Sequence, residues 1–174
     1  LKKKLIIVQF DVIGDYIIFT DILKYFRTFY SKQEWDIILI GDSSWENLIE
    51  LKVNCKDSWV DEFIPINSRD LQFKNYSKRY KILSYLNKLS GDTVLNPNMA
   101  RTENMDLIVR YTSAKNKIGF KRGYVRNGLS TNKNSINDHY YTNLLTAVSD
   151  NVHESISNRL FFEKIVGQCD SSYE

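Results

Sequence analysis

Short apolar runs alternate along the chain with longer segments in which apolar residues recur every three or four positions. The apolar runs that predict buried strands lie at residues 5–10, 35–40, 60–66, 92–96 and 117–120. The segments with helical spacing lie between them, at residues 17–30, 43–52, 69–90 and 102–113. Strands that alternate with helices predict right-handed crossovers and a mainly parallel sheet. We therefore expect an α/β fold with a Rossmann-like, doubly wound sheet.

The first strand and helix frame the most informative stretch, QFDVIGDY at residues 9–16. The preceding apolar run, residues 5–8, is typical of a strand that is buried on both faces. We expect a tight turn at Gly14 and a helix that starts at Asp15. Open α/β sheets bind ligands at the carboxyl ends of their strands, so this acid suits a chemical role. The alternative is a structural role, because Asp is also among the best residues for capping a helix.

The helix expected after this turn carries two apolar stripes. Their members are Phe19, Leu23, Phe26 and Tyr30, and Ile18, Ile22, Tyr25 and Phe29. Together they predict one wide face packed on the sheet. Farther along, Asp42-Ser43-Ser44 is typical of a capped helix start, and Pro65 is expected to stop the third strand.

After Phe120 the pattern loosens. Residues 122–138 are rich in Gly, Asn and Ser and indicate a polar excursion or turn. Residues 140–148 suit either another strand or a short helix, and the pattern does not decide between them. Residues 152–166 predict a closing amphipathic helix whose apolar face uses Ile156, Leu160 and Ile165.

The composition is that of an ordinary soluble globular protein with one domain. The chain has 174 residues, of which 43% are hydrophobic and 26% charged. Its two cysteines, Cys55 and Cys169, belong to no Cys or His cluster, and only two histidines are present, so we expect no metal. The apolar run after the first lysines is too short for a signal peptide, and no stretch approaches the length of a membrane span. We expect a cytoplasmic protein with at most peripheral membrane contact.

Two segments concentrate basic residues although the net charge is only +3. One contains Lys74, Lys78, Arg79, Lys81 and Lys88, and the other contains Lys115, Lys117, Lys121, Arg122 and Arg126. Such groups can bind the phosphates or carboxylates of an anionic acceptor, or attract an anionic membrane leaflet. The alternative is a solvated surface, because Lys and Arg are mostly exposed. We expect no nucleic-acid partner, since the chain lacks the strong basicity of a dedicated binder.

The glycine pattern of the first turn excludes two familiar phosphate loops. Only Gly14 lies there, so neither the dinucleotide fingerprint nor the P-loop is present. The block KLIIVQFDVIGDYIIFTDILKYFRTFY instead resembles the opening of glycosyltransferase family 9, the ADP-heptose:lipopolysaccharide heptosyltransferases. The positions that carry the resemblance are Phe10, Asp11, Gly14, Asp15, Thr20 and Leu23.

Four later segments are similar to the family in the same order, so the resemblance covers residues 3–167. They are WVDEFIPI, DTVLNPN, NKIGF and HESISNRLFFEKIVG. The chain departs from the family pattern at Asp21, where a proline is usual, and at Lys117, where an arginine is usual. Family members have two Rossmann-like domains in the GT-B arrangement, with the acceptor on the amino-terminal one and the nucleotide sugar on the carboxyl-terminal one.

The resemblance implies that this chain is the acceptor-side half of such an enzyme. We expect a single domain at residues 1–167, followed by a tail or the start of an interdomain linker at 168–174. The carboxyl-terminal donor domain is missing from the sequence, and with it the site for a nucleotide sugar such as ADP-heptose. We therefore expect no sugar transfer by this chain alone, and no other cofactor.

The family assigns the role of catalytic base to the aspartate that matches Asp15. Gly14 would let sugar and backbone approach closely. We assign acceptor binding to Asp11, Gly14, Lys117, Lys121 and Arg122, and expect an anionic glycan or glycolipid of the lipopolysaccharide core type. For Asp11 the alternative is an exposed turn residue without a ligand. Contact with the cytoplasmic face of the inner membrane would be peripheral. The alternative function is a non-catalytic Rossmann-like module that binds a small ligand or a partner protein at the same edge of the sheet.

Overall fold

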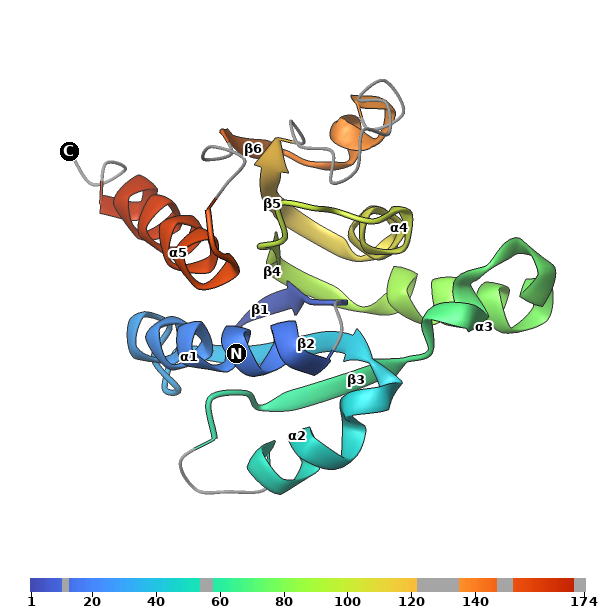
Figure 1. The fold of residues 1–174 in the computed structure, drawn as a ribbon, viewed down its shortest axis with the longest axis horizontal. Helices are drawn as coiled ribbons and strands as arrows, with labels where there is room; N and C mark the ends of the chain where they lie inside the picture. Colours follow the sequence, from blue (N-terminus) through green and yellow to red (C-terminus); the bar gives the residue numbers. More distant parts are fainter. Residues whose placement is uncertain (11–12, 54–57, 122–134, 147–151, 171–174) are drawn as a thin grey trace.

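A parallel sheet forms the middle of the molecule. The computed structural model describes residues 1–10, 13–53, 58–121, 135–146 and 152–170 (Figure 1). Within these ranges six strands pair in the order β3-β2-β1-β4-β5-β6, and every neighbouring pair is parallel. The strands are β1 (Lys3–Val8), β2 (Trp35–Asp42), β3 (Glu62–Ile66), β4 (Ser90–Asn96), β5 (Ser113–Lys121) and β6 (Asn143–Thr146). The predicted α/β, doubly wound fold is confirmed.

Helices cover both faces of this sheet. They are α1 (Ile13–Phe29), α2 (Glu46–Val53), α3 (Tyr76–Lys88), α4 (Glu103–Tyr111) and α5 (Glu154–Asp170). Short 3-10 turns join them to the strands: η1 (Ser43–Trp45), η2 (Ser68–Leu71), η3 (Phe73–Asn75) and η5 (Ser135–Tyr140). Side chains from α1, α2 and α5 pack on one face of the sheet, and side chains from α3 and α4 pack on the other.

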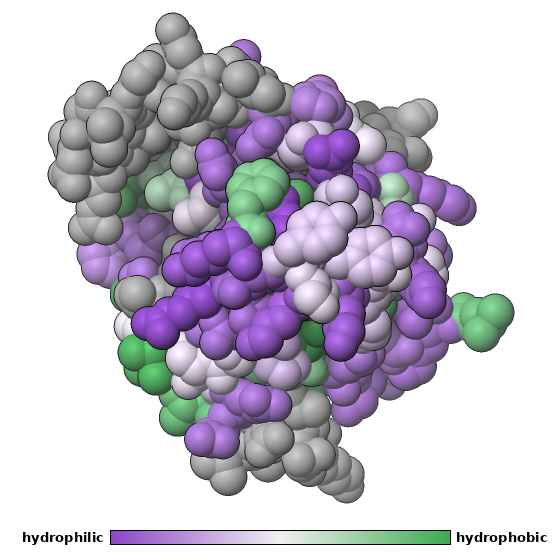
Figure 2. All heavy atoms as spheres, turned by 90° about the vertical axis from the view of Figure 1, so that its right-hand side faces the viewer, coloured by the Kyte–Doolittle hydropathy of each residue, from purple (hydrophilic) through white to green (hydrophobic). Residues whose placement is uncertain are grey.

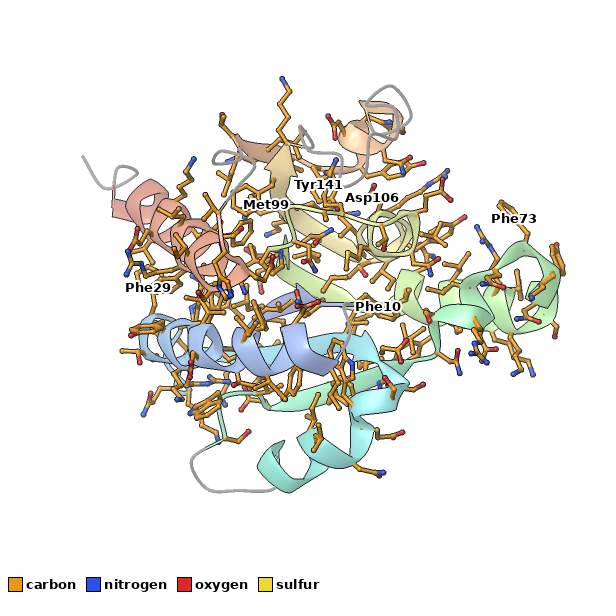
Figure 3. The ribbon with its side chains drawn as sticks, viewed as in Figure 1. Phe10, Phe29, Phe73, Met99, Asp106 and Tyr141 are labelled. Atoms are coloured by element: carbon orange, nitrogen blue, oxygen red, sulfur yellow. The ribbon has the colours of Figure 1, made fainter. Side chains whose placement is uncertain are left out.

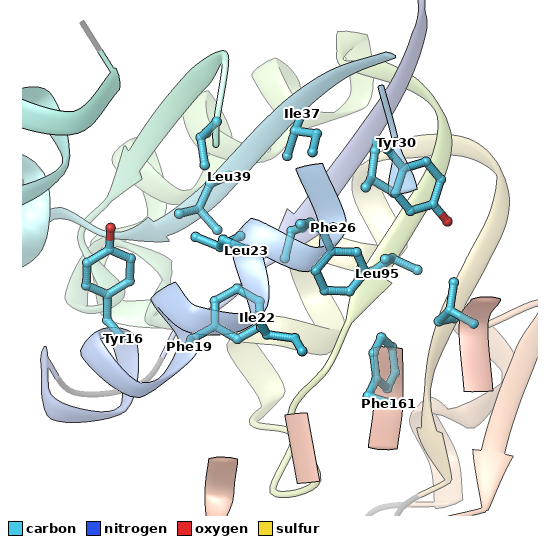
Figure 4. Packing of buried hydrophobic residues seen from close by; sticks show 14 of the residues in the cluster. Tyr16, Phe19, Ile22, Leu23, Phe26, Tyr30, Ile37, Leu39, Leu95 and Phe161 are labelled. Carbon is cyan, nitrogen blue, oxygen red and sulfur yellow. The ribbon is translucent and has the colours of Figure 1, made fainter. Parts of the chain in front are cut away.

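Strand β1 supplies both cores because successive side chains of a strand point to opposite faces. Leu5 and Ile7 face α1, whereas Ile6 and Val8 face α3 and α4, and all four are fully buried. On the first face the predicted stripe of α1 fits between the sheet and Phe161 of α5 (Figure 4). Its buried members are Phe19, Leu23, Phe26 and Tyr30. The second predicted stripe is buried only in part, since Tyr25 and Phe29 are exposed.

The start of α1 differs from the prediction. The helix begins at Ile13, so Gly14 and Asp15 lie inside its first turn rather than ahead of it. Strand β1 correspondingly ends at Val8, and Gln9 and Phe10 follow it. An ideal Cβ added to Gly14 would meet no atom within 4 Å, so this glycine occupies an ordinary helical position facing open space. Residues 11–12, which connect Phe10 to α1, lie outside the described residues.

Two features near the carboxyl terminus also sharpen the sequence interpretation. The undecided stretch at residues 140–148 contains a short parallel strand, β6, which pairs with β5. In α5 the predicted face was wrong at Ile156, which is 47% exposed. The helix instead packs through Ser157, Phe161 and Ile165, which repeat every four residues and lie against the core that α1 shares. Helix α5 runs to Asp170, three residues beyond the predicted end of the domain.

The predicted cap at the start of α2 is confirmed, and β3 ends at Ile66, one residue after Pro65 and so close to the predicted stop. An oxygen of the Asp42 carboxylate, Oδ1, accepts a hydrogen bond from the Ser44 backbone N–H at 3.0 Å and caps η1, which leads into α2. Pro65 lies in β3, an edge strand of the sheet, where a missing N–H breaks no interior ladder.

The two glycines Gly41 and Gly14 give opposite expectations for replacement by alanine. A Cβ at Gly41 would lie 2.5 Å from the ring of Trp45, which is fully buried, and 3.0 Å from the backbone oxygen of Gln9. Gly41→Ala should therefore lower the free energy of unfolding by about 1–3 kcal/mol through overpacking. The matched control, Gly14→Ala, should leave it unchanged or raise it by up to about 1 kcal/mol, because alanine is the better helix former. Urea unfolding measures both, and an equal response of the two variants would contradict the packing at Gly41.

Candidate functional site

The strand order reverses direction between β1 and β4. From β1 the chain moves outward through β2 to β3, and from β4 it moves the other way through β5 to β6. The connections that leave the carboxyl ends of β1 and β4 therefore diverge, and open α/β sheets place their ligands at such a switch point. The segments that begin there are residues 9–15 after β1 and residues 97–102 after β4.

A pair of buried amides bridges the switch point. Gln9 follows β1 and is fully buried, and Asn98 follows β4 and is 3% exposed. The Asn98 side-chain N–H₂ donates to the Gln9 side-chain oxygen at 3.0 Å, and the Asn98 backbone N–H donates to the Asn96 side-chain oxygen at 3.3 Å. Buried amides are costly unless they are hydrogen-bonded, so these bonds fix how the two connections leave the sheet.

The amide pair continues into a longer polar network. The Asn96 side-chain N–H₂ donates to the Tyr141 hydroxyl at 2.8 Å, and that hydroxyl donates to the Asp106 carboxylate at 2.6 Å. The other Asp106 oxygen accepts from the Asn137 side chain at 3.1 Å. Figure 3 shows Tyr141 and Asp106 close together beside α4. The network thus joins the end of β4 to α4 and η5.

Arg101 lies fully buried at the centre of this network. Its guanidinium forms an ion pair with Asp138, lies 3.7 Å from the Asp106 carboxylate through Nε, and stacks 4.4 Å above the Tyr141 ring. Among the described residues Nη1 has no hydrogen-bond partner. A buried guanidinium requires such carboxylate neighbours, because an unpaired charge in the interior is strongly destabilising.

The environment of Tyr141 keeps its hydroxyl protonated. Burial raises the pKa of this phenol far above its usual value, and the adjacent Asp106 carboxylate raises it further, against a smaller opposing effect of Arg101. The hydroxyl is consequently a neutral donor to Asp106 throughout the physiological range. It is suited to holding structure rather than to exchanging a proton.

Asp15, the predicted base, lies at the third position of α1 and is half-buried. The next residue, Tyr16, stacks on Trp45 with ring centroids 4.8 Å apart and so anchors this turn on η1. Among the described residues, no side chain or backbone group forms a hydrogen bond or ion pair with the Asp15 carboxylate. A partly exposed carboxylate in the first turn of α1, with no partner among the described residues, has the chemistry that a general base requires.

The other predicted site residues are dispersed. The Lys117 ammonium donates to the Arg110 carbonyl at 3.0 Å and so lies on the α4 face, whereas Asp15 belongs to α1 on the opposite face. Burial lowers the pKa of Lys117. Lys121 is exposed at the carboxyl end of β5. Asp11 and Arg122 lie outside the described residues.

The sequence interpretation assigned no role to the residues of the buried network. A usable signal was present for three of them, because Gln9, Asn96 and Asn98 come directly after apolar strand runs, at the ends of the two central strands. Arg101 offered no such signal, since an arginine is expected at the surface.

The described part of the chain also lacks a metal cluster and a membrane span. It contains no group of three or more His, Cys, Asp or Glu side chains placed to hold a metal ion. None of its helices combines the length and apolar character needed to cross a bilayer.

Comparison with known proteins identifies the fold. No protein-family model and no curated protein matches the sequence. Among solved structures, a glycosyl transferase of family 9 from Veillonella parvula matches 92% of this chain with a TM-score of 0.68 and 16% identity. The E. coli heptosyltransferase WaaC with ADP-2-deoxy-2-fluoro heptose matches 94% with a TM-score of 0.67 and 14% identity, and WaaC with ADP matches 92% with a TM-score of 0.64.

The likeness concerns one part of those proteins. This chain spans 40% of the length of the Veillonella protein and 47–48% of WaaC. The resemblance to glycosyltransferase family 9 is thus confirmed at the level of the fold. The chain has a Rossmann-like fold that matches about half of each of these glycosyltransferase structures.

Removal of the Tyr141 hydroxyl should lower the free energy of unfolding far more than removal of the Tyr140 hydroxyl. Tyr141→Phe removes the hydrogen-bond acceptor of the buried Asn96 N–H₂ and the hydroxyl donor to one oxygen of the buried Asp106 carboxylate, so the free energy of unfolding should fall by about 1–3 kcal/mol. Tyr140→Phe is the matched control, because the Tyr140 hydroxyl only accepts a surface hydrogen bond from Arg110 at 3.1 Å. Urea unfolding compares the two, and equal losses would show that the network contributes no more than a surface contact.

Asp42 should make the free energy of unfolding fall as the pH is lowered into the acid range. Burial raises the pKa of this carboxyl, but the hydrogen bonds from Ser44 and Ser68 outweigh it and hold the pKa below its usual value. The carboxylate therefore stabilises the fold above about pH 4, and this contribution is lost as the pH falls through the folded-state pKa. Asp42→Asn should be less stable than the natural protein at pH 7, and the difference should narrow in acid. Urea unfolding across this range measures it, and a difference that stays constant with pH would contradict the assignment.

Proposed function

We propose that this chain is the acceptor-binding domain of an inverting glycosyltransferase. The transferred group would be heptose or a similar sugar, moved from a nucleotide sugar to a lipopolysaccharide core or a related anionic glycan. The observation that carries the proposal is the position of Asp15. This half-buried carboxylate, free of internal partners in the described part of the chain, lies beside the switch point of a fold that glycosyltransferase structures share.

The proposed chemistry needs one proton acceptor on this domain. The acceptor hydroxyl oxygen attacks the anomeric carbon of the donor sugar, and the bond from that carbon to the diphosphate oxygen breaks. Asp15 takes the hydroxyl proton as the new glycosidic bond forms, and the departing nucleoside diphosphate keeps the electron pair of the broken bond. Attack from the side opposite the leaving group inverts the configuration at that carbon.

The surroundings of Asp15 support this role in two ways. The bridge between Gln9 and Asn98 and the stacking of Tyr16 on Trp45 anchor the chain on either side of Asp15, which would help to hold the base in position for a ligand. Gly14 presents no side chain toward open space, which leaves room for a sugar ring beside the carboxylate. The other proposed acceptor contacts are Lys121, at the carboxyl end of β5, and Asp11 and Arg122, which follow the carboxyl ends of β1 and β5 in the sequence. Lys117 contributes least, because its ammonium already binds the end of α4.

The donor would bind elsewhere. Since this chain spans less than half of the structures it resembles, we propose that a second domain, outside this sequence, holds the nucleotide sugar, for example ADP-heptose. The chain alone would then transfer no sugar and would require no metal. The proposed place of action is the cytoplasmic face of the inner membrane, with no nucleic acid involved.

One observation favours the second candidate function, a non-catalytic binding module. The predicted basic residue Lys117 and the predicted base lie on opposite faces of the sheet, so the expected cluster of acceptor ligands is incomplete. A module of this kind would use the same switch point to hold a ligand without transforming it.

Replacement of Asp15 by Asn in a protein that includes the donor domain tests the proposal. Asp15→Asn should lower kcat by about a hundredfold to ten-thousandfold, the usual contribution of a general base, with little change in acceptor affinity. Asp21→Asn is the matched control, because Asp21 is an exposed acid on the same helix that only pairs with Lys24 at 3.0 Å. Initial rates with a phosphorylated core oligosaccharide measure kcat, and calorimetry measures binding. A near-normal rate for Asp15→Asn would exclude the base, and binding without any turnover by the natural protein would favour the module.

A further inference from the structure

Three large aromatic side chains project from one end of the molecule. Phe73 in η3 is 81% exposed, and Tyr76 and Tyr80 in α3 are 76% and 66% exposed. Tyr76 and Tyr80 are four residues apart, so they lie on the same side of the helix, and Phe73 precedes them by one turn. Single exposed apolar residues need no explanation, but a row of rings this exposed marks an interaction surface.

Three lysines belong to the same segment as the rings. Lys78 and Lys81 project from a different side of α3 than Tyr76 and Tyr80, because helix residues one or two positions apart do not face each other. Lys74, Lys78 and Lys81 are all exposed and succeed one another by four and three residues. We call the three rings (Phe73, Tyr76 and Tyr80) and the three lysines (Lys74, Lys78 and Lys81) together the aromatic and basic surface. The buried side of α3, with Leu83 and Leu86, is turned away from it toward the sheet.

The figures show how this surface is presented. Phe73 lies at the far end of the molecule and points away from the sheet (Figure 3). Viewed from that side, several ring-bearing side chains stand out from strongly hydrophilic surroundings (Figure 2). The surface is raised rather than hollow, so it suits contact with a broad, flat partner.

The local charge is strongly positive. Residues 69–88 contain six Lys or Arg residues and a single acid, Asp70, which pairs with Lys78 at 3.1 Å. The Arg79 guanidinium stacks 4.1 Å above the Phe73 ring. Beside that ring, a groove of about 390 Å³ between α3, α4 and η5 also contains Arg110, together with one carboxylate, Glu103. The partner is therefore expected to carry many negative charges.

We propose that the aromatic and basic surface docks this chain onto an anionic phospholipid membrane. Phe73 enters the boundary between headgroups and acyl chains, and the two tyrosines lie at the headgroup level with their hydroxyls in water. The lysines attract the anionic headgroups, at about 1 kcal/mol, or about fivefold in binding, for each basic residue near the surface. A few apolar contacts or a few charges bind a membrane only weakly alone, and here both occur on the outer half of α3 and the turn before it.

The arrangement favours a membrane over single-stranded nucleic acid. Proteins that bind single strands place stacking rings inside a basic groove that follows the backbone. Here the rings lie on the outer side of a helix, and Lys78 and Lys81 project from a different side of it. Lipid docking rests on the proposed place of action at the inner membrane, but it does not require sugar transfer, so vesicle binding and catalysis can each fail without the other.

Vesicle sedimentation with the 174-residue chain tests the proposal. The chain should bind vesicles of phosphatidylcholine mixed with phosphatidylglycerol, bind vesicles of phosphatidylcholine alone much more weakly, and lose binding as salt rises. Lys74→Gln combined with Lys81→Gln should weaken binding to the anionic vesicles by about twentyfold. Phe73→Ser combined with Tyr76→Ser should weaken binding to both vesicle types. Circular dichroism verifies that each variant is folded, as expected for exposed positions.

Matched controls test whether binding depends on this surface or only on the total charge and number of exposed rings. Lys4→Gln combined with Lys115→Gln removes the same charge near the amino ends of β1 and β5, and Tyr25→Ser removes an exposed ring from α1. These controls should bind within about twofold of the natural chain, as a surface charge distant from the contact contributes little. The proposal would be overturned by any of four results. The controls could lose as much vesicle binding as the test variants, or the natural chain could bind neutral and anionic vesicles equally. The natural chain could also bind no vesicle, or bind a single-stranded oligonucleotide more tightly than anionic vesicles.

Discussion

The complete burial of β1 is the constraint on which the rest of the structure depends. Leu5, Ile6, Ile7 and Val8 have no solvent exposure, and β1 pairs with β2 on one side and β4 on the other. A strand in that position must be apolar on both faces, and helices must cover both of them. The strand order also changes direction between β1 and β4. The strand that contributes to both cores therefore also ends at the candidate site. The core and the candidate site therefore depend on the same strand.

Much of the fold could be predicted because its signals are local. Each apolar run corresponds to a strand, and the capping residues of η1 and the buried stripe of α1 were readable from spacing alone. The exceptions occur where tertiary packing decides. Helix α5 buries Ser157 rather than Ile156, because its position against α1, not its most apolar stripe, sets the face that is covered. Helix α1 begins two residues before Asp15, as helix starts depend on what the preceding turn can satisfy.

The candidate site was harder to predict, for a physical reason. Asp15 could be proposed from the sequence because it closely follows a strand at the carboxyl end of the sheet. The residues that hold that edge rigid are distributed over β4, α4 and η5, and they meet only after the chain has folded. Arg101 is the extreme case. Its burial depends on Asp106, Asp138 and the Tyr141 ring, partners up to forty residues away that no local pattern connects.

The short, proline-bearing strand β3 has a consequence for how this chain behaves in solution. The edge of an open sheet exposes unpaired N–H and C=O groups and can recruit a strand from another molecule. Pro65 removes a donor from one edge of this sheet, and the strand at the other edge, β6, is only four residues long. Neither edge is a good template for a further strand. The sheet therefore carries its own protection against edge-to-edge aggregation, whatever else covers the molecule.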